Sequence, residues 1–358
     1  MFAKFKRPLS FMRTIRELVS HPARRTYFPN CAQKGRMAIL IDNLVWLFKY
    51  GQLNRYYYLY GLDLKNSRPA NFMHAKNFYR VRDRINEQGT VGRFRANYIC
   101  LLRDKFIFGQ FLKSLGFACP PTLALCDKQN IDWLDTAVSQ PLENIVMRNC
   151  DCFIKPLLSE MAHCVYPLKV ENKTIYISGR PGDVEQLRAV IDGKSMLQQR
   201  IVQHPELSRM YPFAINTIRV VTACNCSSIK VLSAILRVGT ASKFCDNWGA
   251  GGIAVGIDMK TSRLVGHGFF RPDFGKITPV HPDTKIAFEG FEIPFFKDVL
   301  EYARRLHGFF YGIQSIGWDF AITPDGPLCL EGNDNWGLPM MQIFDDHIVE
   351  KYFKTLKK

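Results

Sequence analysis

The sequence contains no apolar segment long enough to cross a membrane and no recognisable secretory leader. Its longest apolar stretch, residues 37–48, is interrupted by Asp42 and Asn43 and falls short of the roughly 20 apolar residues that a transmembrane helix needs. The N-terminal run MFAKFKRPLSFMRTIREL has neither a continuous apolar core nor a small-residue cleavage site, so we expect no signal peptide. These absences favour a cytoplasmic protein.

Common cysteine and nucleotide-binding motifs are absent as well. Eleven cysteines are scattered along the chain, and the close pairs Cys150/Cys152 and Cys224/Cys226 are C-x-C rather than C-x-x-C, which disfavours a common zinc or redox motif. We therefore interpret the cysteines as reduced, space-filling residues. The glycine-rich segment 247–258 matches neither G-x-x-x-x-G-K-[ST] nor G-x-G-x-x-G, so by itself it indicates only a loop near a ligand.

Positive charge is concentrated near the N-terminus. Residues 1–120 contain 22 Lys and Arg against 6 Asp and Glu, whereas residues 121–358 contain 26 of each kind. The whole net charge of +16 therefore lies in the first third of the chain. Such asymmetry indicates an acidic partner, such as anionic lipid, nucleic acid or an acidic polymer. A solvated basic surface without a partner is the alternative.

Two observations narrow the choice of acidic partner. No nucleic-acid-binding motif accompanies the charge, so we expect no nucleic acid partner. Residues 1–20 could form a helix with apolar and basic residues on different sides, which would suit peripheral docking on the inner face of an anionic membrane. The alternative is a helix packed on the protein's own core. The apolar side would comprise Phe2, Phe5, Phe11, Met12, Ile15 and Leu18, and the basic side Lys4, Lys6, Arg7, Arg13 and Arg16.

The chain divides by pattern into three regions. Residues 1–100 look basic and mainly helical, residues 101–203 form a first lobe, and residues 204–358 form a second lobe. The polar, proline-containing segment 198–212 is a candidate hinge. Helical spacing recurs at 102–115, 184–191 and 296–310, and apolar strand patterns lie at 152–158, 173–179, 196–202, 216–224, 229–239 and 252–258. This mixture predicts an α+β fold rather than an alternating, doubly wound sheet.

The segment WDFAITPDGPLCLEGN, residues 318–333, predicts a β-hairpin with two carboxylates at its open end. Pro324-Asp325-Gly326 suits a three-residue turn. Strict alternation then places Thr323 opposite Pro327, Ala321 opposite Cys329 and Asp319 opposite Glu331. The core side would carry Trp318, Phe320, Ile322, Leu328 and Leu330.

The opposite face of this hairpin predicts a metal site. Asp319, Glu331 and Asn333 share that face, where directly opposed carboxylates repel each other. Carboxylate and amide oxygens are ligands that Mg²⁺ prefers, usually together with phosphate oxygens. We therefore predict a metal–nucleotide site. The alternative is an exposed hairpin end whose acids stay hydrated.

Four basic residues are candidates for phosphate binding. Lys155 lies in an apolar strand, where a lysine either extends to solvent or meets an anion. Lys105 follows the candidate helix cap Asp104, and cations at a helix N-terminus attract phosphate together with the backbone N–H groups. Arg219 and Arg237 lie in apolar strands and suit phosphate or carboxylate. Surface lysines and structural ion pairs are the alternatives.

Taken in order, these elements resemble the ATP-grasp superfamily, in which two α+β lobes clamp Mg-ATP. The resemblance covers about residues 104–341, and the D…E-x-N set of Asp319, Glu331 and Asn333 is its most specific motif. The segments NTIRVVT, GGIAVGID and WDFAITPDGPLCLEGN look closest to the sugar-transfer-associated ATP-grasp family. That family is tied by association to surface-polysaccharide synthesis.

The resemblance implies roles for particular residues. Lys105 and Lys155 would bind the ATP phosphates. The backbone of the hinge segment that contains Gln199 and Ile201 would bind adenine, and Glu206 or a neighbour would bind the ribose. Arg219, Arg237 and Asn247, together with the pair Gly251-Gly252, resemble the series of the glutamate-ligase-like branch and would form the catalytic pocket.

Two departures from the family pattern concern the substrate side. The loop after Lys155, LLSEMAHCVYP, has no glycine, although members of the superfamily commonly cover the triphosphate with a glycine-rich loop. Ser159 and His163 could substitute there. Gly317 occupies a position where peptide-ligase members often have a substrate-binding arginine, which implies a different acceptor site.

The expected activity is ligation of a carboxylate to an amine or thiol through an acyl phosphate, with ATP and Mg²⁺ as cofactors. A small-molecule or glycan carboxylate, such as an acidic sugar, and an amino compound would be the substrates. Two alternatives stay open. One is phosphorylation of a sugar hydroxyl. The other is a membrane-surface binding protein with a degenerate nucleotide fold.

Overall fold

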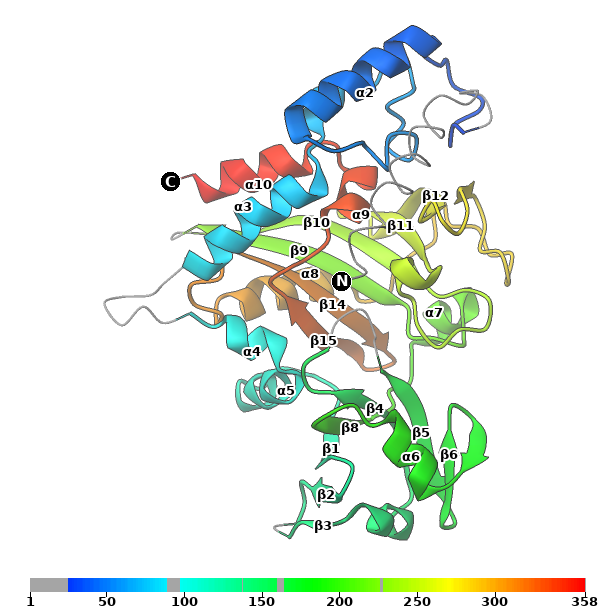
Figure 1. Cartoon of the computed structure of the whole chain (residues 1–358), viewed down its shortest axis with the longest axis vertical. Helices are drawn as coiled ribbons and strands as arrows, with labels where there is room; N and C mark the ends of the chain where they lie inside the picture. The colour runs from blue at the N-terminus through cyan, green and yellow to red at the C-terminus, as the bar shows by residue number, and fades with distance from the viewer. Residues whose placement is uncertain (1–24, 89–96, 137, 160–163, 226–227, 358) are drawn as a thin grey trace, which may run out of the picture.

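The structure is a computed structural model that describes residues 25–88, 97–136, 138–159, 164–225 and 228–357 (Figure 1). The predicted N-terminal helix within residues 1–20 and His163 lie outside these residues. The predicted α+β class is confirmed, because two antiparallel sheets are covered by helices. Among the described helices, none has both the length and the apolar character needed to cross a membrane.

The first sheet has eight strands in the order β3-β2-β1-β8-β4-β5-β6-β7, all paired antiparallel. Its core lies between the sheet and α6 (Val184–Val190) and η3 (Leu142–Met147). Burial alternates along β4, so that Cys152 and Ile154 enter this core while Lys155 lies on the other face. The strands are β1 (Thr122–Cys126), β2 (Asn130–Trp133), β3 (Gln140–Pro141), β4 (Cys150–Pro156), β5 (Tyr166–Glu171), β6 (Thr174–Ile177), β7 (Arg180–Gly182) and β8 (Ser195–Gln199).

The second sheet has seven antiparallel strands in the order β13-β12-β11-β10-β9-β14-β15. Along β9, Val220 enters the core on one face and Val221 enters the core on the other. Both faces are therefore covered, which explains why these strands read as continuous apolar runs. The strands are β9 (Thr217–Asn225), β10 (Ser228–Val238), β11 (Ile253–Asp258), β12 (Arg263–Phe270), β13 (Ile277–Thr278), β14 (Ser315–Thr323) and β15 (Gly326–Asn333).

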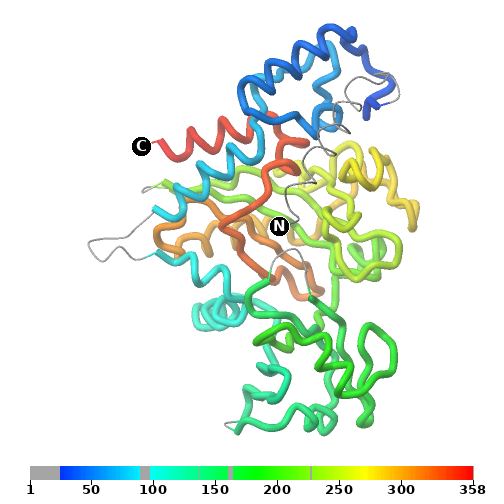
Figure 2. Tube along the Cα trace, viewed as in Figure 1, coloured from blue at the N-terminus to red at the C-terminus, as the bar shows by residue number. Residues whose placement is uncertain are grey.

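Helices cover the second sheet on both sides (Figures 1 and 2). On one face pack α4 (Ile99–Arg103), α5 (Lys105–Ser114), α7 (Pro205–Met210) and α8 (Phe296–His307). On the other pack α3 (Ala75–Gln88), α9 (Leu338–Phe344) and α10 (Ile348–Leu356), with η4 (Trp248–Ala250). A small separate core carries α2 (Arg36–Tyr50), near η2 (Pro69–Asn71). The division of the chain at residues 100 and 203 stays a prediction.

The hairpin of β14 and β15 pairs Asp319 with Glu331 as predicted, but its tip differs from the prediction. Thr323 pairs with Gly326, and Phe320 pairs with Cys329. The register shifts between the Asp319 and Phe320 pairs, so that Leu330 is an extra residue in β15 and forms a β-bulge. The predicted register is therefore wrong by one residue at the turn, and the bulge restores the predicted pairing at the carboxylates.

The bulge also corrects the predicted core face. Cys329 is fully buried with Trp318 and Phe320 in the core under α8. Leu328, which strict alternation assigns to that core, is only half-buried, and Leu330 occupies the bulge. The prediction was wrong here because side chains alternate only where the pairing is regular.

We expect Cys329→Asp to lower the free energy of unfolding by about 3 kcal/mol or more, because it buries an unpaired charge. Leu328→Asp should cost only about 1 kcal/mol, since that position is half-open. Chemical denaturation of both variants measures the difference. A larger loss for Leu328→Asp would contradict the bulged register.

Candidate active site

Asp319 is a buried carboxylate clamped by two arginines. It is 1% exposed and accepts two hydrogen bonds from Arg219, one of them Nη2 to Oδ2 at 2.8 Å. Arg237 Nη2 lies 3.0 Å from the same Oδ2. These residues come from neighbouring strands β14, β9 and β10, with Arg219 paired with Asp319 in the ladder. The sheet register therefore fixes this group of charges.

The predicted catalytic roles of Arg219 and Arg237 stay predictions. Sequence reasoning assigned both guanidinium groups to a phosphate or carboxylate, with structural ion pairs as the alternative. In the structure both are engaged in ion pairs with Asp319. Each guanidinium has five N–H groups. Any contact with an acyl-phosphate intermediate would use the N–H groups that do not bond to Asp319.

Two residues that sequence reasoning missed orient Arg237. Arg237 Nε and Nη2 donate to Thr217 Oγ1 at 2.9 and 2.6 Å, and Nε lies 3.5 Å from Asp246 Oδ2. The same Asp246 oxygen accepts from the backbone N–H of Thr217 at 2.9 Å. Asp246 lies in the loop before η4, so no strand pattern could have revealed it.

The glycine pair beside this loop has a structural role. Gly251 has φ of 102°, a left-handed conformation that favours glycine. A Cβ on Gly252 would lie 2.3 Å from the carbonyl oxygen of Asp246. Asn247 caps η4 by accepting from the N–H of Gly249 at 2.8 Å. Asn247, Gly251 and Gly252 thus lie in one loop with Asp246, the partner of Arg237. Substrate contact by Asn247 stays a prediction.

Glu331 and Asp319 have opposite electrostatic environments. Burial by itself would raise the pKa of Asp319, but the charges of Arg219 and Arg237 outweigh it and hold that pKa well below its usual value. Burial, followed by the neighbouring charge of Asp319, raises the pKa of Glu331. The two carboxylates therefore lie close enough to interact, and Glu331 is the one whose charge is incompletely compensated.

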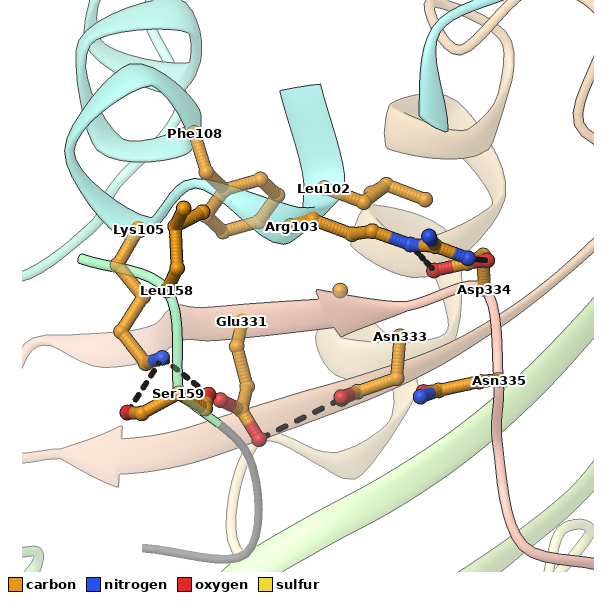
Figure 3. A pocket seen from close by; sticks show the side chains of 11 residues that line it. Leu102, Arg103, Lys105, Phe108, Leu158, Ser159, Glu331, Asn333, Asp334 and Asn335 are labelled. Atoms are coloured by element: carbon orange, nitrogen blue, oxygen red, sulfur yellow. Dashed lines mark hydrogen bonds and ion pairs between the residues drawn. The ribbon is translucent and has the colours of Figure 1, made fainter. Parts of the chain in front are cut away.

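A pocket of about 360 Å³ lies beside these carboxylates (Figure 3). Glu331, Asn333 and Lys105 line it, together with Ser159 from the segment after β4. Asn333 Nδ2 donates to the carbonyl oxygen of Gly317 at 3.3 Å and lies 3.4 Å from Glu331 Oε1. The three predicted metal-binding residues therefore form one connected group, with Asp319 buried behind the other two.

Lys105 occupies the first position of α5, as predicted. Asp104 caps the helix by accepting from the backbone N–H groups of Phe106 and Ile107, both at 2.9 Å. Lys105 Nζ donates to Ser159, with 3.0 Å to Oγ. The backbone N–H of Lys105 also donates to the carbonyl of Leu157 at 3.1 Å. These contacts connect α5 to the segment after β4, where the glycine-poor loop begins.

Lys155 reaches the same group from the first sheet. Burial lowers its pKa to about 8, while the charge of Glu331 raises it and the charge of Lys105 lowers it further. Lys155 therefore lies within electrostatic range of both residues. The structure therefore places both predicted phosphate lysines near Glu331.

Arg103 and Asp334, which sequence reasoning also missed, line the other end of the pocket. Arg103 Nε and Nη2 donate to Asp334 at 3.2 and 2.8 Å, and Asp334 is 3% exposed. Between the site residues, Gly332 packs against α4, because a Cβ there would lie 2.7 Å from Leu102. This packing holds β15 against α4, and with it the side chains of Glu331 and Asn333, which line the pocket.

The predicted nucleotide-base residues lie in and after β8. Gln199 ends β8, and its N–H donates to the carbonyl of Pro121 at 2.9 Å. Ile201 lies in the irregular segment before α7. Glu206 lies in the first turn of α7 and pairs with Arg209 at 2.7 Å. Their contacts with adenine and ribose stay predictions.

The oxygen donors of Asp319, Glu331 and Asn333 suit a hard divalent cation such as Mg²⁺. Each carboxylate oxygen has two acceptor positions, so the arginine bonds of Asp319 leave it with further capacity. In the described residues, no cluster of three or more His, Cys, Asp and Glu side chains could hold a metal ion. The proposed set has two carboxylates and one amide.

The fold is that of an ATP-grasp protein. Residues 93–358 match the family described as sugar-transfer associated ATP-grasp. The chain belongs to that family, which confirms the resemblance seen in the sequence. A comparison with curated proteins finds no match.

Several solved structures are similar to the chain at low identity. N5-carboxyaminoimidazole ribonucleotide synthetase from Thermotoga maritima is 13% identical, with a TM-score of 0.35 over 66% of this chain and 43% of that one. D-alanine-D-alanine ligase from Helicobacter pylori is 12% identical, with a TM-score of 0.41 over 72% and 62%. The ligase from Bacillus anthracis complexed with ATP is 12% identical, with a TM-score of 0.39 over 71% and 66%. The match spans less than two thirds of the first two chains, and the family membership rests on residues 93–358.

We expect Asp319→Asn and Glu331→Gln to change stability in opposite directions at pH 7 without added metal. Asp319→Asn removes the negative partner of two nearly buried arginines and should lower the free energy of unfolding by about 3–5 kcal/mol. Glu331→Gln should raise it, because the raised pKa of Glu331 means that its charged form disfavours folding.

The raised pKa of Glu331 also predicts how the stability gain of Glu331→Gln depends on pH. A carboxyl group with a raised pKa in the folded protein penalises stability above that pKa, and the penalty disappears as the pH falls through it. The advantage of Glu331→Gln should therefore shrink toward the ordinary glutamate pKa. Denaturation midpoints measured between neutral and acidic pH check this. An advantage that grows on acidification would contradict the assignment.

Proposed function

We propose that the protein is an ATP-dependent ligase that joins a carboxylate to an amine or thiol through an acyl phosphate. The observation that carries the proposal is that Lys105 of α5 and Glu331 of the second sheet line one pocket, with Lys155 of the first sheet within electrostatic range of both. Cations opposite a carboxylate pair are suited to holding a polyphosphate chain with its metal ion. Family membership supports the use of ATP.

In this mechanism, Lys105 and Lys155 would neutralise phosphate oxygens of ATP, and Asp319, Glu331 and Asn333 would hold Mg²⁺. Bound there, the ion would supply charge stabilisation at the transferred phosphoryl group. Arg219 keeps Asp319 ionised and fixed. Arg237 belongs to the same charged network through its ion pair with Asp319. Catalysis of this kind rests mostly on positioning and electrostatics.

The proposed ligation has two steps. A substrate carboxylate oxygen bonds to the γ-phosphorus while the bond from that phosphorus to the bridging oxygen breaks, releasing ADP. The amine nitrogen then bonds to the acyl carbon, the bond from that carbon to the phosphate oxygen breaks, and the nitrogen loses a proton. Asn247 and the adjacent glycine pair would shape the pocket for this intermediate.

We propose an acidic sugar or a glycan carboxylate as the acid, with an amino compound as acceptor, in surface-polysaccharide synthesis. Support for this choice comes from the family description and not from a contact in the pocket. Gly317 supports a distinct acceptor site, since a Cβ there would lie 2.5 Å from the Cβ of Trp336. A side chain of arginine size has no room at that position.

Turnover of ATP to ADP should depend on an acidic sugar in a panel of acids and amines. Lys155→Met should lower kcat/KM by about 100-fold or more, because it removes a preorganised phosphate cation. Glu331→Gln should lower activity strongly without loss of fold. Lys113→Met is the matched control, since Lys113 is exposed at the far end of α5. Undiminished turnover in Lys155→Met and Glu331→Gln would refute the site.

Hydroxylamine trapping distinguishes ligation from phosphorylation of a hydroxyl. An acyl phosphate gives a hydroxamate when hydroxylamine replaces the amine, whereas a sugar phosphate does not. We expect hydroxamate formation that depends on ATP and the acid. ATP turnover with a phosphorylated sugar and no hydroxamate would replace the ligase with a kinase.

Affinity for ATP should fall as the pH rises from 7 to 9. Lys155 has a pKa of about 8, so the free protein loses this positive charge through that range, which lowers affinity by up to about tenfold. Titration calorimetry with a non-hydrolysable ATP analogue measures the dependence. Lys155→Arg keeps its charge and should flatten the profile. An equal fall in that variant would assign the effect to another group.

A further inference from the structure

Helix α2 is apolar around most of its circumference, although only one side of it is covered. Its inner side buries Ile39 and Trp46. They belong to a small core completed by Tyr57, Leu62 and Phe72. A helix that is apolar all round is normally enclosed by other elements. The opposite side of α2 is instead open to solvent.

The open side forms a continuous apolar stripe. Its large side chains are between 44% and 87% exposed, with Phe48 the most exposed. The positions follow the i, i+3, i+4, i+7 spacing that aligns side chains along one helix face. Contiguous exposed patches of this kind mark interaction sites. The six residues are Met37, Leu40, Ile41, Leu44, Val45 and Phe48. We call them the α2 stripe.

Positive charge surrounds the α2 stripe. Residues 25–88 contain 11 Lys and Arg against 4 Asp and Glu, a difference of +7. Exposed Arg36 and Lys49 stand at the two ends of α2, and the bridge between Gln33 and Leu64 places Lys65 near its start. The single acidic residue of α2, Asp42, is paired with Lys34 at 2.7 Å. The stripe is therefore flanked by basic residues.

We propose that the α2 stripe docks the protein on an anionic lipid surface, with α2 lying in the plane of the interface. The 15 residues of α2 extend only about 22 Å, too short to span a bilayer core of about 30 Å. An apolar face flanked by Lys and Arg is the pattern of helices that insert at the headgroup boundary. This inference does not depend on the proposed ligase activity.

Charge complementarity favours lipid over two other occupants. In a symmetric pair of chains joined through this stripe, the flanking basic residues would face each other. Residues 1–24 are themselves basic, with six Lys and Arg against one Glu, so the same repulsion would oppose their packing there. An anionic surface matches both the apolar stripe and its positive margin.

Docking through α2 would leave the candidate active site accessible. α2 lies at one end of the long axis, the strands β1–β3 lie at the other, and β15 with α5 lies between them (Figures 1 and 2). An enzyme attached in this way would act on substrates near a membrane surface while its pocket faces the surrounding solution.

Vesicle flotation with the full-length protein tests the proposal. We expect binding to vesicles of phosphatidylcholine with about 30% phosphatidylglycerol, weak binding to phosphatidylcholine alone, and weakening when salt rises from about 0.1 M to about 0.5 M. The double variant Val45→Glu/Phe48→Glu should lower the partition coefficient by about tenfold or more. Val138→Glu/Met147→Glu makes the same charge change at exposed apolar residues of the first lobe and should bind like the parent.

Each other outcome overturns the proposal. Absence of binding of the parent protein to anionic vesicles contradicts it directly. Equal binding by the α2 variant would assign docking to residues outside the stripe. Equal losses of vesicle binding in both double variants would show that net charge alone determines binding. A parent dimer in sedimentation velocity that the α2 variant converts to monomer, without vesicle binding, would make the stripe an interface between copies. Unchanged thermal melting confirms that each variant is folded.

Discussion

The ion cluster around Asp319 is the constraint on which the rest of the site depends. Two guanidinium groups compensate this buried carboxylate, and Asp246 in turn orients one of them. Glu331 is the fifth group of this cluster. When it is ionised, the cluster carries three negative and two positive charges, which leaves one unit of negative charge beside the pocket. The lysines lie near that charge, so the pocket combines an excess of oxygen donors with nearby cations. Sheet register, and not loop conformation, maintains this arrangement, since all but Asp246 lie within strands.

The sequence predicted those parts of the structure that depend on local periodicity. Alternation and helical spacing identified the main strands and helices, and the helix cap Asp104 followed from its position before Lys105. Asp246 and the pair of Arg103 with Asp334 were missed because their partners are distant in the chain, which no local period reveals. The bulge at Leu330 was missed for another reason. Nothing in an alternating pattern indicates where one strand gains a residue, although the pairing of Asp319 with Glu331 survived the error.

The departures from the wider superfamily pattern have physical explanations on the protein side. Trp336 fills the space beside Gly317, which removes the position where an arginine would reach the acceptor. Ser159, at the start of the glycine-poor loop, already contacts Lys105. A loop with side chains in place of glycines has fewer backbone conformations available. The residues proposed for phosphate binding, Lys105 and Lys155, are thus different from the residues at the proposed acceptor side, Gly317 and Trp336.

The first sheet has a hydrophobic core distinct from the two cores that flank the second sheet. Lys155 belongs to the first sheet, whereas Lys105 and Glu331 are anchored on the core of the second. A ligand that touches all three is bound only while both bodies are folded, so its binding free energy is shared between them. Such a ligand couples two units that have separate cores. Calorimetric transitions of the two units would then merge on saturation, and the unit built on the first sheet would gain protection from proteolysis.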